Sequence, residues 1–260
     1  MNTYLQTTTS SPLFYIRLFR PEKRNALSGM LVSELKKVLT DVSLMPDIRA
    51  VIITAEGSVF SAGADLDYLK QLMSNTYEEN LADSQSLAEL FLLLYHYPKI
   101  VITQIEGAAI AGGCGLACMG DFVFAVPEAT FGYTEVKIGF IPAIVSIFLI
   151  RKIGEAKARE ILLSGSVFSS QEAKDYGMIT KIVPRESIAE HVTEFALRLC
   201  RETSPESIRL TKELIAGIQD KELEGAIDYA AEMNAKARGT NECREGITAF
   251  LEKRKVQWLR

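Results

Sequence analysis

The sequence predicts an α/β core followed by a helical C-terminal section. Two observations support this prediction. Short apolar segments alternate with longer segments of helical periodicity over the first two-thirds of the chain, and only amphipathic helical patterns follow them. On this pattern, the α/β core takes up about 190 residues.

Four apolar segments of the core predict strands. Arg17 alternates outward within Leu13–Phe19, which predicts an edge strand, whereas the other three are apolar enough to be buried: Ala50–Thr54, Ile100–Ile105 and Phe122–Val126. Met30–Val42 and Asp83–Tyr95 lie between them and have helical periodicity. Strands that alternate with helices at this spacing indicate crossover units and a mainly parallel sheet.

The last third of the chain predicts four amphipathic helices. Pro205 after Ser204 is typical of a helix start, and Asn241 is a second such start. The predicted helices are Ser187–Arg201, Pro205–Ile218, Leu223–Arg238 and Asn241–Lys255.

Composition narrows the functional class. The 260 residues carry a net charge of −4, so we expect no nucleic-acid partner. The N-terminus lacks a secretory pattern and no apolar run is long enough for a bilayer, which predicts a soluble cytoplasmic protein without a membrane partner. The four cysteines and two histidines lack metal-ligand spacing, so we expect reduced thiols and no metal.

Two segments rich in small residues follow predicted strands. Phe60–Asp65 comes a few residues after the strand Ala50–Thr54, and Gly107–Gly115 follows Ile100–Ile105 with one residue between them. Small residues let a backbone approach a ligand closely, and a helix that starts within Gly107–Gly115 would expose N–H groups to an anion. Two such loops at the ends of neighbouring strands could each place one N–H on the same oxygen, forming an oxyanion hole.

Two alternatives apply to the Gly107–Gly115 segment. A glycine-rich loop before a helix also serves simply as a tight turn that allows close packing. The segment matches neither the phosphate-binding loop with its Gly-Lys-Ser/Thr end nor the Gly-x-Gly-x-x-Gly pattern, so a dinucleotide fold is disfavoured.

Glu135 is the candidate acid/base. It lies in the apolar, turn-rich segment Ala129–Pro142, where partial desolvation would raise its pKa and suit it to general acid/base catalysis. The alternative is an ion pair with Lys137 or a solvated position.

These segments, in this order and spacing, resemble the enoyl-CoA hydratase/isomerase (crotonase) superfamily. Glu22–Leu27, Leu163–Gly165 with Gln171–Gly177, and Glu245–Arg254 match as well, so the resemblance extends over nearly the whole chain. It implies a crotonase (ClpP-like) spiral of strand-strand-helix turns with two roughly perpendicular sheets. The implied division is a spiral core over residues 1–195 and a helical oligomerisation region over residues 196–260, which forms a homotrimer or hexamer.

The resemblance also implies roles for individual residues. The N–H groups of Ala62 and Gly112 would hold the thioester oxygen, and Glu135 would match the second catalytic glutamate of the hydratases. The acyl-CoA substrate, which takes the place of any separate cofactor, would contact a larger set: Arg24, Ala26, Ala62, Gly63, Ala64, Asp65, Leu66, Gly112, Tyr133, Pro142, Phe250 and Lys253. Phe250 and Lys253 would approach CoA from a C-terminal helix, either of the same subunit or of a neighbour.

Gly115 departs from the family pattern, because typical hydratases have their first catalytic glutamate at this position. We therefore expect a hydratase that uses Glu135 alone or recruits another group, for which Tyr133 is a candidate. The alternatives are a Δ3,Δ2-enoyl-CoA isomerase with Glu135 as its sole acid/base, a decarboxylase or thioester hydrolase that uses the same oxyanion hole, and a non-catalytic CoA-binding protein. Phe131–Ala143, together with Gly115, looks closest to methylglutaconyl-CoA or carboxygeranoyl-CoA hydratases, whose substrates carry a second carboxylate.

Overall fold

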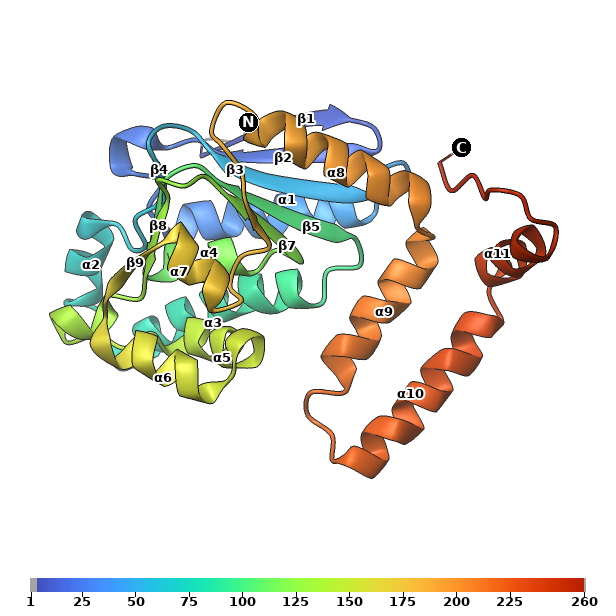
Figure 1. The fold of residues 1–260 in the computed structure, drawn as a ribbon. Coiled ribbons are helices and arrows are strands. Elements are labelled where there is room, and N and C mark those ends of the chain that lie inside the picture. Colours follow the sequence, from blue (N-terminus) through green and yellow to red (C-terminus); the bar gives the residue numbers. More distant parts are fainter. Residues whose placement is uncertain (1–3, 260) are drawn as a thin grey trace.

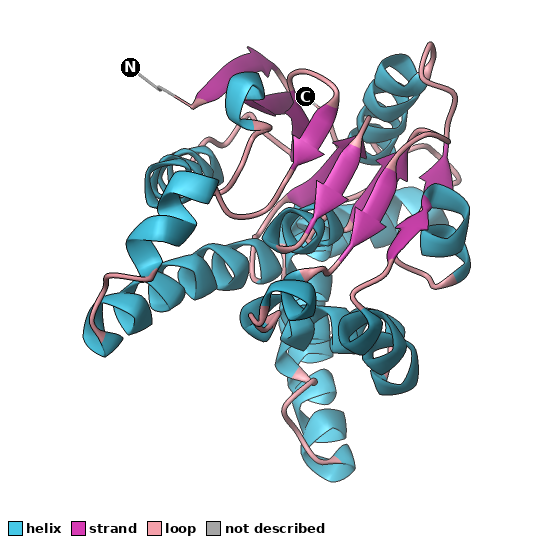
Figure 2. Cartoon of the chain, turned by 90° about the vertical axis from the view of Figure 1, so that its left-hand side faces the viewer, coloured by secondary structure: helices cyan, strands magenta, loops and turns pink. Residues whose placement is uncertain are grey.

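The chain folds into a core of two sheets surrounded by helices, from which a helical arm extends (Figure 1). The computed structural model describes residues 4–259, apart from the side chains of Leu66 and Gln71. Figure 2 shows the strands side by side in the core with helices around them.

The larger sheet has six strands. Their order across the sheet is β1 (Leu5–Ser10), β2 (Leu13–Leu18), β3 (Ala50–Ala55), β5 (Ile100–Ile105), β7 (Phe122–Ala125) and β10 (Lys181–Ile182). All neighbours are parallel except β1 and β2, which are antiparallel. The mainly parallel sheet is thus confirmed. The prediction of an edge strand at Leu13–Phe19 is wrong, because β1, whose polar Gln-Thr-Thr-Thr run gives no apolar signal, pairs with it and takes the edge.

The smaller sheet has four strands, in the order β4 (Val59–Ser61), β6 (Ala108–Ile110), β8 (Thr130–Gly132) and β9 (Val167–Ser169). The chain alternates between the sheets: β3 is followed by β4, β5 by β6, and β7 by β8, with helices after each pair. This is the predicted strand-strand-helix spiral. Because β4, β6 and β8 are parallel neighbours, their carboxyl ends meet at one edge of the smaller sheet.

Helices cover the sheets. In chain order the core helices are α1 (Gly29–Ser43), α2 (Leu66–Leu72), α3 (Tyr77–Tyr95), α4 (Gly112–Cys118), α5 (Ala143–Ile153), α6 (Glu155–Ser164), α7 (Ser170–Asp175) and α8 (Ile188–Glu202). α3 begins six residues earlier than Asp83, at a capping box. There the Thr76 hydroxyl accepts a hydrogen bond from the Glu79 amide, and the Glu79 carboxylate accepts one from the Thr76 amide. α8 lies across the larger sheet, where the hydroxyl oxygens of Tyr15 and Thr193 are 3.0 Å apart.

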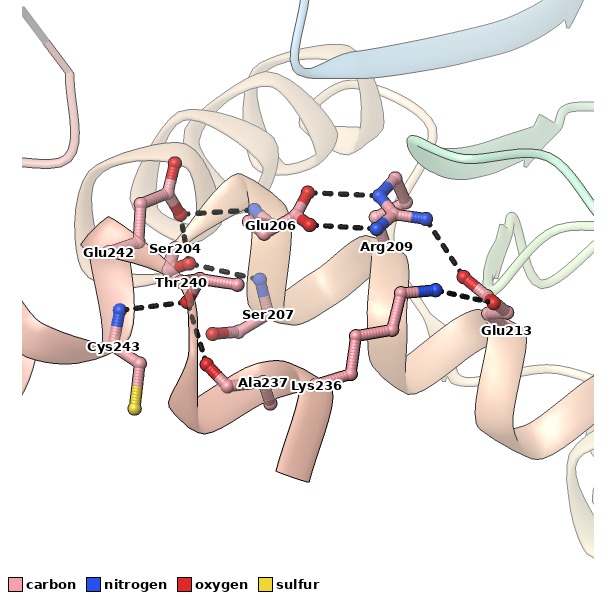
Figure 3. Close-up of polar contacts among 10 residues, drawn as sticks. All are labelled: Ser204, Glu206, Ser207, Arg209, Glu213, Lys236, Ala237, Thr240, Glu242 and Cys243. Atoms are coloured by element: carbon pink, nitrogen blue, oxygen red, sulfur yellow. Dashed lines mark hydrogen bonds and ion pairs between the residues drawn. The ribbon is translucent and has the colours of Figure 1, made fainter. Parts of the chain in front are cut away.

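The arm consists of α9 (Pro205–Gly217), α10 (Leu223–Arg238) and α11 (Asn241–Leu251). Figure 3 shows how polar contacts join them: Arg209 pairs with Glu206 and Glu213, Lys236 also pairs with Glu213, and Glu242 accepts hydrogen bonds from Ser204 and the Glu206 amide. The predicted boundary after residue 195 lies inside α8, and the arm leaves the core only after α8 ends (Figure 1).

One buried asparagine fixes the loop before α1. Asn25 has no exposed surface; its side-chain amide donates to the carbonyls of Glu56 and Val59 at 2.8 Å each, and its Oδ1 accepts from the Arg20 amide at 2.8 Å. These bonds tie the loop, including the short 3₁₀ helix η1 (Pro21–Lys23), to the segment between β3 and β4. The loop is thereby held at the start of β4, and the hydrogen bond from the Ala62 amide to the Arg24 carbonyl holds it just past the carboxyl end of β4.

We expect Asn25→Ala to lower the free energy of unfolding by about 3 kcal/mol, because it leaves three partly buried backbone groups without their partners. The measurement is chemical denaturation. Arg24→Ala is the matched control, since Arg24 has a similar left-handed φ of 52° but an exposed side chain, and it should change stability by less than about 1 kcal/mol. Equal losses for the two variants would contradict this account of Asn25.

Candidate functional site

The two loops rich in small residues meet at the carboxyl ends of β4 and β6. Gly63 has a left-handed φ of 81°, and a Cβ built on it would lie 2.8 Å from the Ala111 Cβ, 2.9 Å from the Ile110 oxygen and 3.5 Å from the Gly112 nitrogen. A side chain at position 63 would therefore be excluded by both sterics and backbone conformation. The predicted convergence of the two loops is present in the structure.

Ala111 makes the turn from β6 into α4 within one residue. Its N–H donates to the Gly132 carbonyl at 2.7 Å as in a strand, while its carbonyl accepts from the Gly115 amide at 3.1 Å as in a helix. To do both it takes φ 52° and ψ −130°, a conformation that costs a non-glycine residue about 1–3 kcal/mol. Such strain tends to persist where it serves a function, and here it sets the direction of the next N–H group, that of Gly112.

The amides at this junction are not equivalent. The Ala62 N–H donates to the Arg24 carbonyl at 3.0 Å, and the Gly63 N–H points to Ser61 Oγ at 3.4 Å. Ala62 as an oxyanion donor is therefore a wrong prediction, because its only N–H is already used within the fold. Within the described residues, nothing accepts a hydrogen bond from the N–H of Ala64 or of Gly112, the first residue of α4.

Glu135 begins the 3₁₀ helix η2 (Glu135–Ile138), three residues after β8. Since Gly132 pairs with the Ala111 region and three residues span at most about 11 Å, Glu135 stays near Gly112. The side chain is buried, and among the described residues none donates a hydrogen bond to its Oε2. Desolvation by burial raises the pKa of Glu135 above its ordinary value of 4.5. Among the described residues Glu135 forms no ion pair with Lys137 or with another cation, so its carboxyl group remains available for proton transfer.

The loop around Arg24 lies beside these residues. Arg24 is exposed and, within the described residues, makes no ion pair, while Ala64 is exposed and Ala26 is buried. Asp65 is buried and forms an ion pair with Arg20 at 2.9 Å, so it holds the loop in place instead of facing solvent. The side chain of Leu66, also predicted to contact CoA, lies outside the described residues.

Tyr133 and Pro142 are buried rather than open to a ligand. Tyr133 lies beside the thiols of Cys114 and Cys118 on α4, and burial raises its pKa well above its usual value. A phenol that keeps its proton and packs against α4 makes a poor catalytic helper, so the structure favours a packing role. Pro142 precedes α5, and its carbonyl accepts from the Ser146 amide at 3.0 Å.

Phe250 and Lys253 do not join the site within one chain. Figure 1 places α11 on the opposite side of the molecule from α2 and β4. Phe250 is 82% exposed. The predicted helix end at Lys255 is too late: α11 ends at Leu251, so Lys253 lies past the helix, where it is exposed and has a left-handed φ of 55°. A contact between these residues and CoA would thus need the arm of a neighbouring subunit.

Sequence reasoning missed the residues that surround Gly115. A Cβ on Gly115 would lie 2.3 Å from Val145 Cγ1 and 3.1 Å from Phe91 Cε1, so the space that a side chain would need is filled. Val145 and Phe91 come from α5 and α3, and nothing in the local sequence connects them to α4.

Other kinds of site find little support in the described part of the chain. The four cysteines are free thiols, and residues 4–259 contain no group of three or more His, Cys, Asp or Glu side chains placed to hold a metal. None of the described helices is long and apolar enough to cross a membrane. Two clefts lie between the core and the arm, away from Glu135.

The family model of enoyl-CoA hydratase/isomerase matches residues 8–260. The chain belongs to the enoyl-CoA hydratase/isomerase family. A Thermus thermophilus protein, named an enoyl-CoA hydratase on a provisional basis, is 42% identical over 90% of this chain and 92% of its own length.

Solved structures of this enoyl-CoA hydratase/isomerase family share the fold. A crystal structure of an enoyl-CoA hydratase from Shewanella pealeana has a TM-score of 0.93 and 32% identity, covering 99% of this chain and 96% of the other. An enoyl-CoA hydratase from Bacillus anthracis has a TM-score of 0.90 and 29% identity, covering 99% and 100%. The predicted crotonase fold is therefore confirmed.

We expect Gly115→Ala to destabilise this member of the enoyl-CoA hydratase/isomerase family by about 1–3 kcal/mol, because the added methyl group overlaps Val145. Gly225→Ala is the matched control: Gly225 is also helical, but a Cβ there meets nothing within 4 Å, so stability should rise by up to about 1 kcal/mol. Denaturant unfolding of both variants measures this, and a neutral effect at Gly115 would disprove the overlap.

Proposed function

We propose that the protein is an enoyl-CoA hydratase, a lyase that adds water across the double bond of a 2-enoyl-CoA thioester. The observation that carries the proposal is Glu135, buried and without a hydrogen-bond donor to Oε2, close to the free N–H group at the start of α4. Family membership supplies the thioester substrate class.

In the proposed mechanism the thioester oxygen accepts hydrogen bonds from the N–H groups of Ala64 and Gly112. Ala64 replaces Ala62 because it is the exposed residue of its loop whose N–H has no acceptor among the described residues. Each donor of this kind is worth about 10²–10³ in kcat, because it stabilises the negative charge that develops on the oxygen.

Glu135 acts as both base and acid. Its carboxylate removes a proton from water as the water oxygen bonds to C3, and electrons move onto the thioester oxygen to form an enolate. The same proton then passes from Glu135 to C2 as the carbonyl re-forms. One carboxylate is sufficient for this addition because it returns the proton that it takes.

Glu135→Gln should lower kcat for crotonyl-CoA hydration by at least about 100-fold while leaving the affinity for CoA unchanged, since only proton transfer is removed. Loss of the conjugated enoyl-thioester absorbance follows the reaction, and calorimetry follows CoA binding. Glu128→Gln is the control, because Glu128 is an exposed partner of Arg185. Full activity of Glu135→Gln would refute the proposed role.

The raised pKa of Glu135 gives a second prediction. The carboxylate is the active form, so the acid limb of the pH–rate profile should lie above pH 4.5. The folded protein binds this proton more tightly than the unfolded chain, so stability falls as pH rises from the unfolded pKa through the folded one. The melting temperature of Glu135→Gln should therefore exceed that of the wild type at pH values above the folded pKa of Glu135, and the two should match at pH values below the unfolded pKa. A constant difference at all pH values would contradict this linkage.

An isomerase that moves a 3-enoyl double bond is the second candidate. Val145 fills the space beside Gly115 where a second carboxylate would lie, and Glu135 alone is enough to carry a proton between carbon atoms. Appearance of the conjugated band from a 3-enoyl-CoA, without hydration of crotonyl-CoA, would favour it. A decarboxylase, a thioester hydrolase and a non-catalytic CoA-binding protein remain the further alternatives.

We further propose a substrate subgroup and an oligomeric state. Gly115 and Phe131–Ala143 support a methylglutaconyl-CoA-like substrate, which a comparison of crotonyl-CoA with 3-methylglutaconyl-CoA in the same assay would test. We also propose a homotrimer or hexamer in which the arm packs on another copy, since large apolar side chains of α10 and α11 are exposed: Leu223, Ile227, Ile247, Phe250 and Leu251. The cytoplasmic location and a pathway in fatty acid or branched-chain amino acid breakdown stay predictions.

A further inference from the structure

The space one turn into α4 from Gly112 is closed by an aliphatic side chain. Gly112 and Gly115 are three residues apart, so they lie on the same face of the helix. A Cβ on Gly115 would lie 2.3 Å from Cγ1 and 2.9 Å from Cβ of Val145, which is 4% exposed. Val145 therefore packs directly against the backbone of α4 beside the proposed oxyanion hole.

Aromatic side chains support Val145 from behind. Phe91 on α3 lies 3.1 Å from the same Cβ position, and its ring centroid is 5.6 Å from that of Phe148 on α5. Phe148 in turn lies 5.4 Å from Tyr95. Beyond this layer is a cleft between the core and α9, lined by Tyr95 and Phe148 among others. The layer thus separates the proposed site from open space on the far side.

We infer that Val145 is a specificity-determining residue that limits the length of the acyl chain. Its methyl groups occupy the volume next to α4 that a longer acyl chain would enter, so the site accepts short acyl groups in preference to long ones. The inference rests on the proposed placement of the thioester at Gly112 but is independent of which reaction follows.

The test measures binding rather than turnover. Dissociation constants of butyryl-CoA and octanoyl-CoA, saturated thioesters that cannot be hydrated, are measured by calorimetry for the wild type and three variants. Val145→Ala should shift the preference toward octanoyl-CoA by about tenfold, the scale of one or two methylenes in an apolar pocket, and Val145→Ile should shift it the other way. Leu149→Ala is the matched control, because Leu149 lies one turn further along α5 and is also buried, with 2% exposure. The preference of this variant should match that of the wild type.

The outcomes separate this inference from the proposed function. An unchanged preference in Val145→Ala and Val145→Ile, with both variants folded by circular dichroism, overturns the role of Val145. The same shift in Leu149→Ala also overturns it, since general loosening of the core would then explain the result. If the preference moves as expected while wild-type protein fails to hydrate any enoyl-CoA, the acyl-chain limit stands and the hydratase assignment fails. The Val145→Ile variant keeps the test decisive if Val145→Ala does not fold.

Discussion

The contact between the Gly63 loop and the start of α4 is the constraint on which the site depends. It exists because β4, β6 and β8 are parallel neighbours, so the loops that follow them leave the smaller sheet at the same edge. Pairing of Gly132 with the Ala111 region brings in the segment that carries Glu135. Three segments that are far apart in sequence thereby meet through backbone register alone, before any functional side chain is considered. The strained Ala111 is a local cost of this arrangement, which the rigid hydrogen bonds on both sides of it sustain.

The same arrangement explains why the site is electrostatic in character. The loops present N–H groups and small side chains. Of the two buried carboxyl groups beside them, Asp65 is paired with Arg20, whereas the Oε2 of Glu135 has no partner among the described residues. Burial raises the pKa of Glu135 because water no longer stabilises its charge, and the described residues provide no cation in compensation. A carboxyl group in this condition keeps its proton to a higher pH than an exposed one, and its ionisation in the folded protein costs stability. This combination of a costly carboxylate with free backbone donors distinguishes the region from an ordinary tight turn.

The sequence allowed much of the fold to be predicted, because its buried strands are continuous apolar runs and its arm helices have clear periodicity. It failed at β1, where a polar edge strand has no apolar pattern, and at the start of α3, where Tyr77–Asn80 is polar and only the capping box marks the boundary. In the site, the convergence of the two loops and the burial of Glu135 were predicted. The prediction of Ala62 as a donor failed because its N–H donates to the carbonyl of Arg24, 38 residues earlier in the chain. This bond decides which of the three consecutive amides, those of residues 62 to 64, is free. Such long-range partners leave no local signal.

Gly115 shows how a single position connects packing to chemistry. From the sequence it appears as a missing glutamate, which suggests a site weakened by the loss of one group. The structure shows instead that Val145 of α5, supported by Phe91, occupies the volume that a side chain at position 115 would need, so that the helix faces a packed apolar surface. Restoring a carboxylate there would require removal of Val145 as well, because two side chains cannot occupy the space. The one-carboxylate site is thus a property of the packing between α3, α4 and α5. A change at position 115 alone would be expected to damage the fold before it altered the reaction.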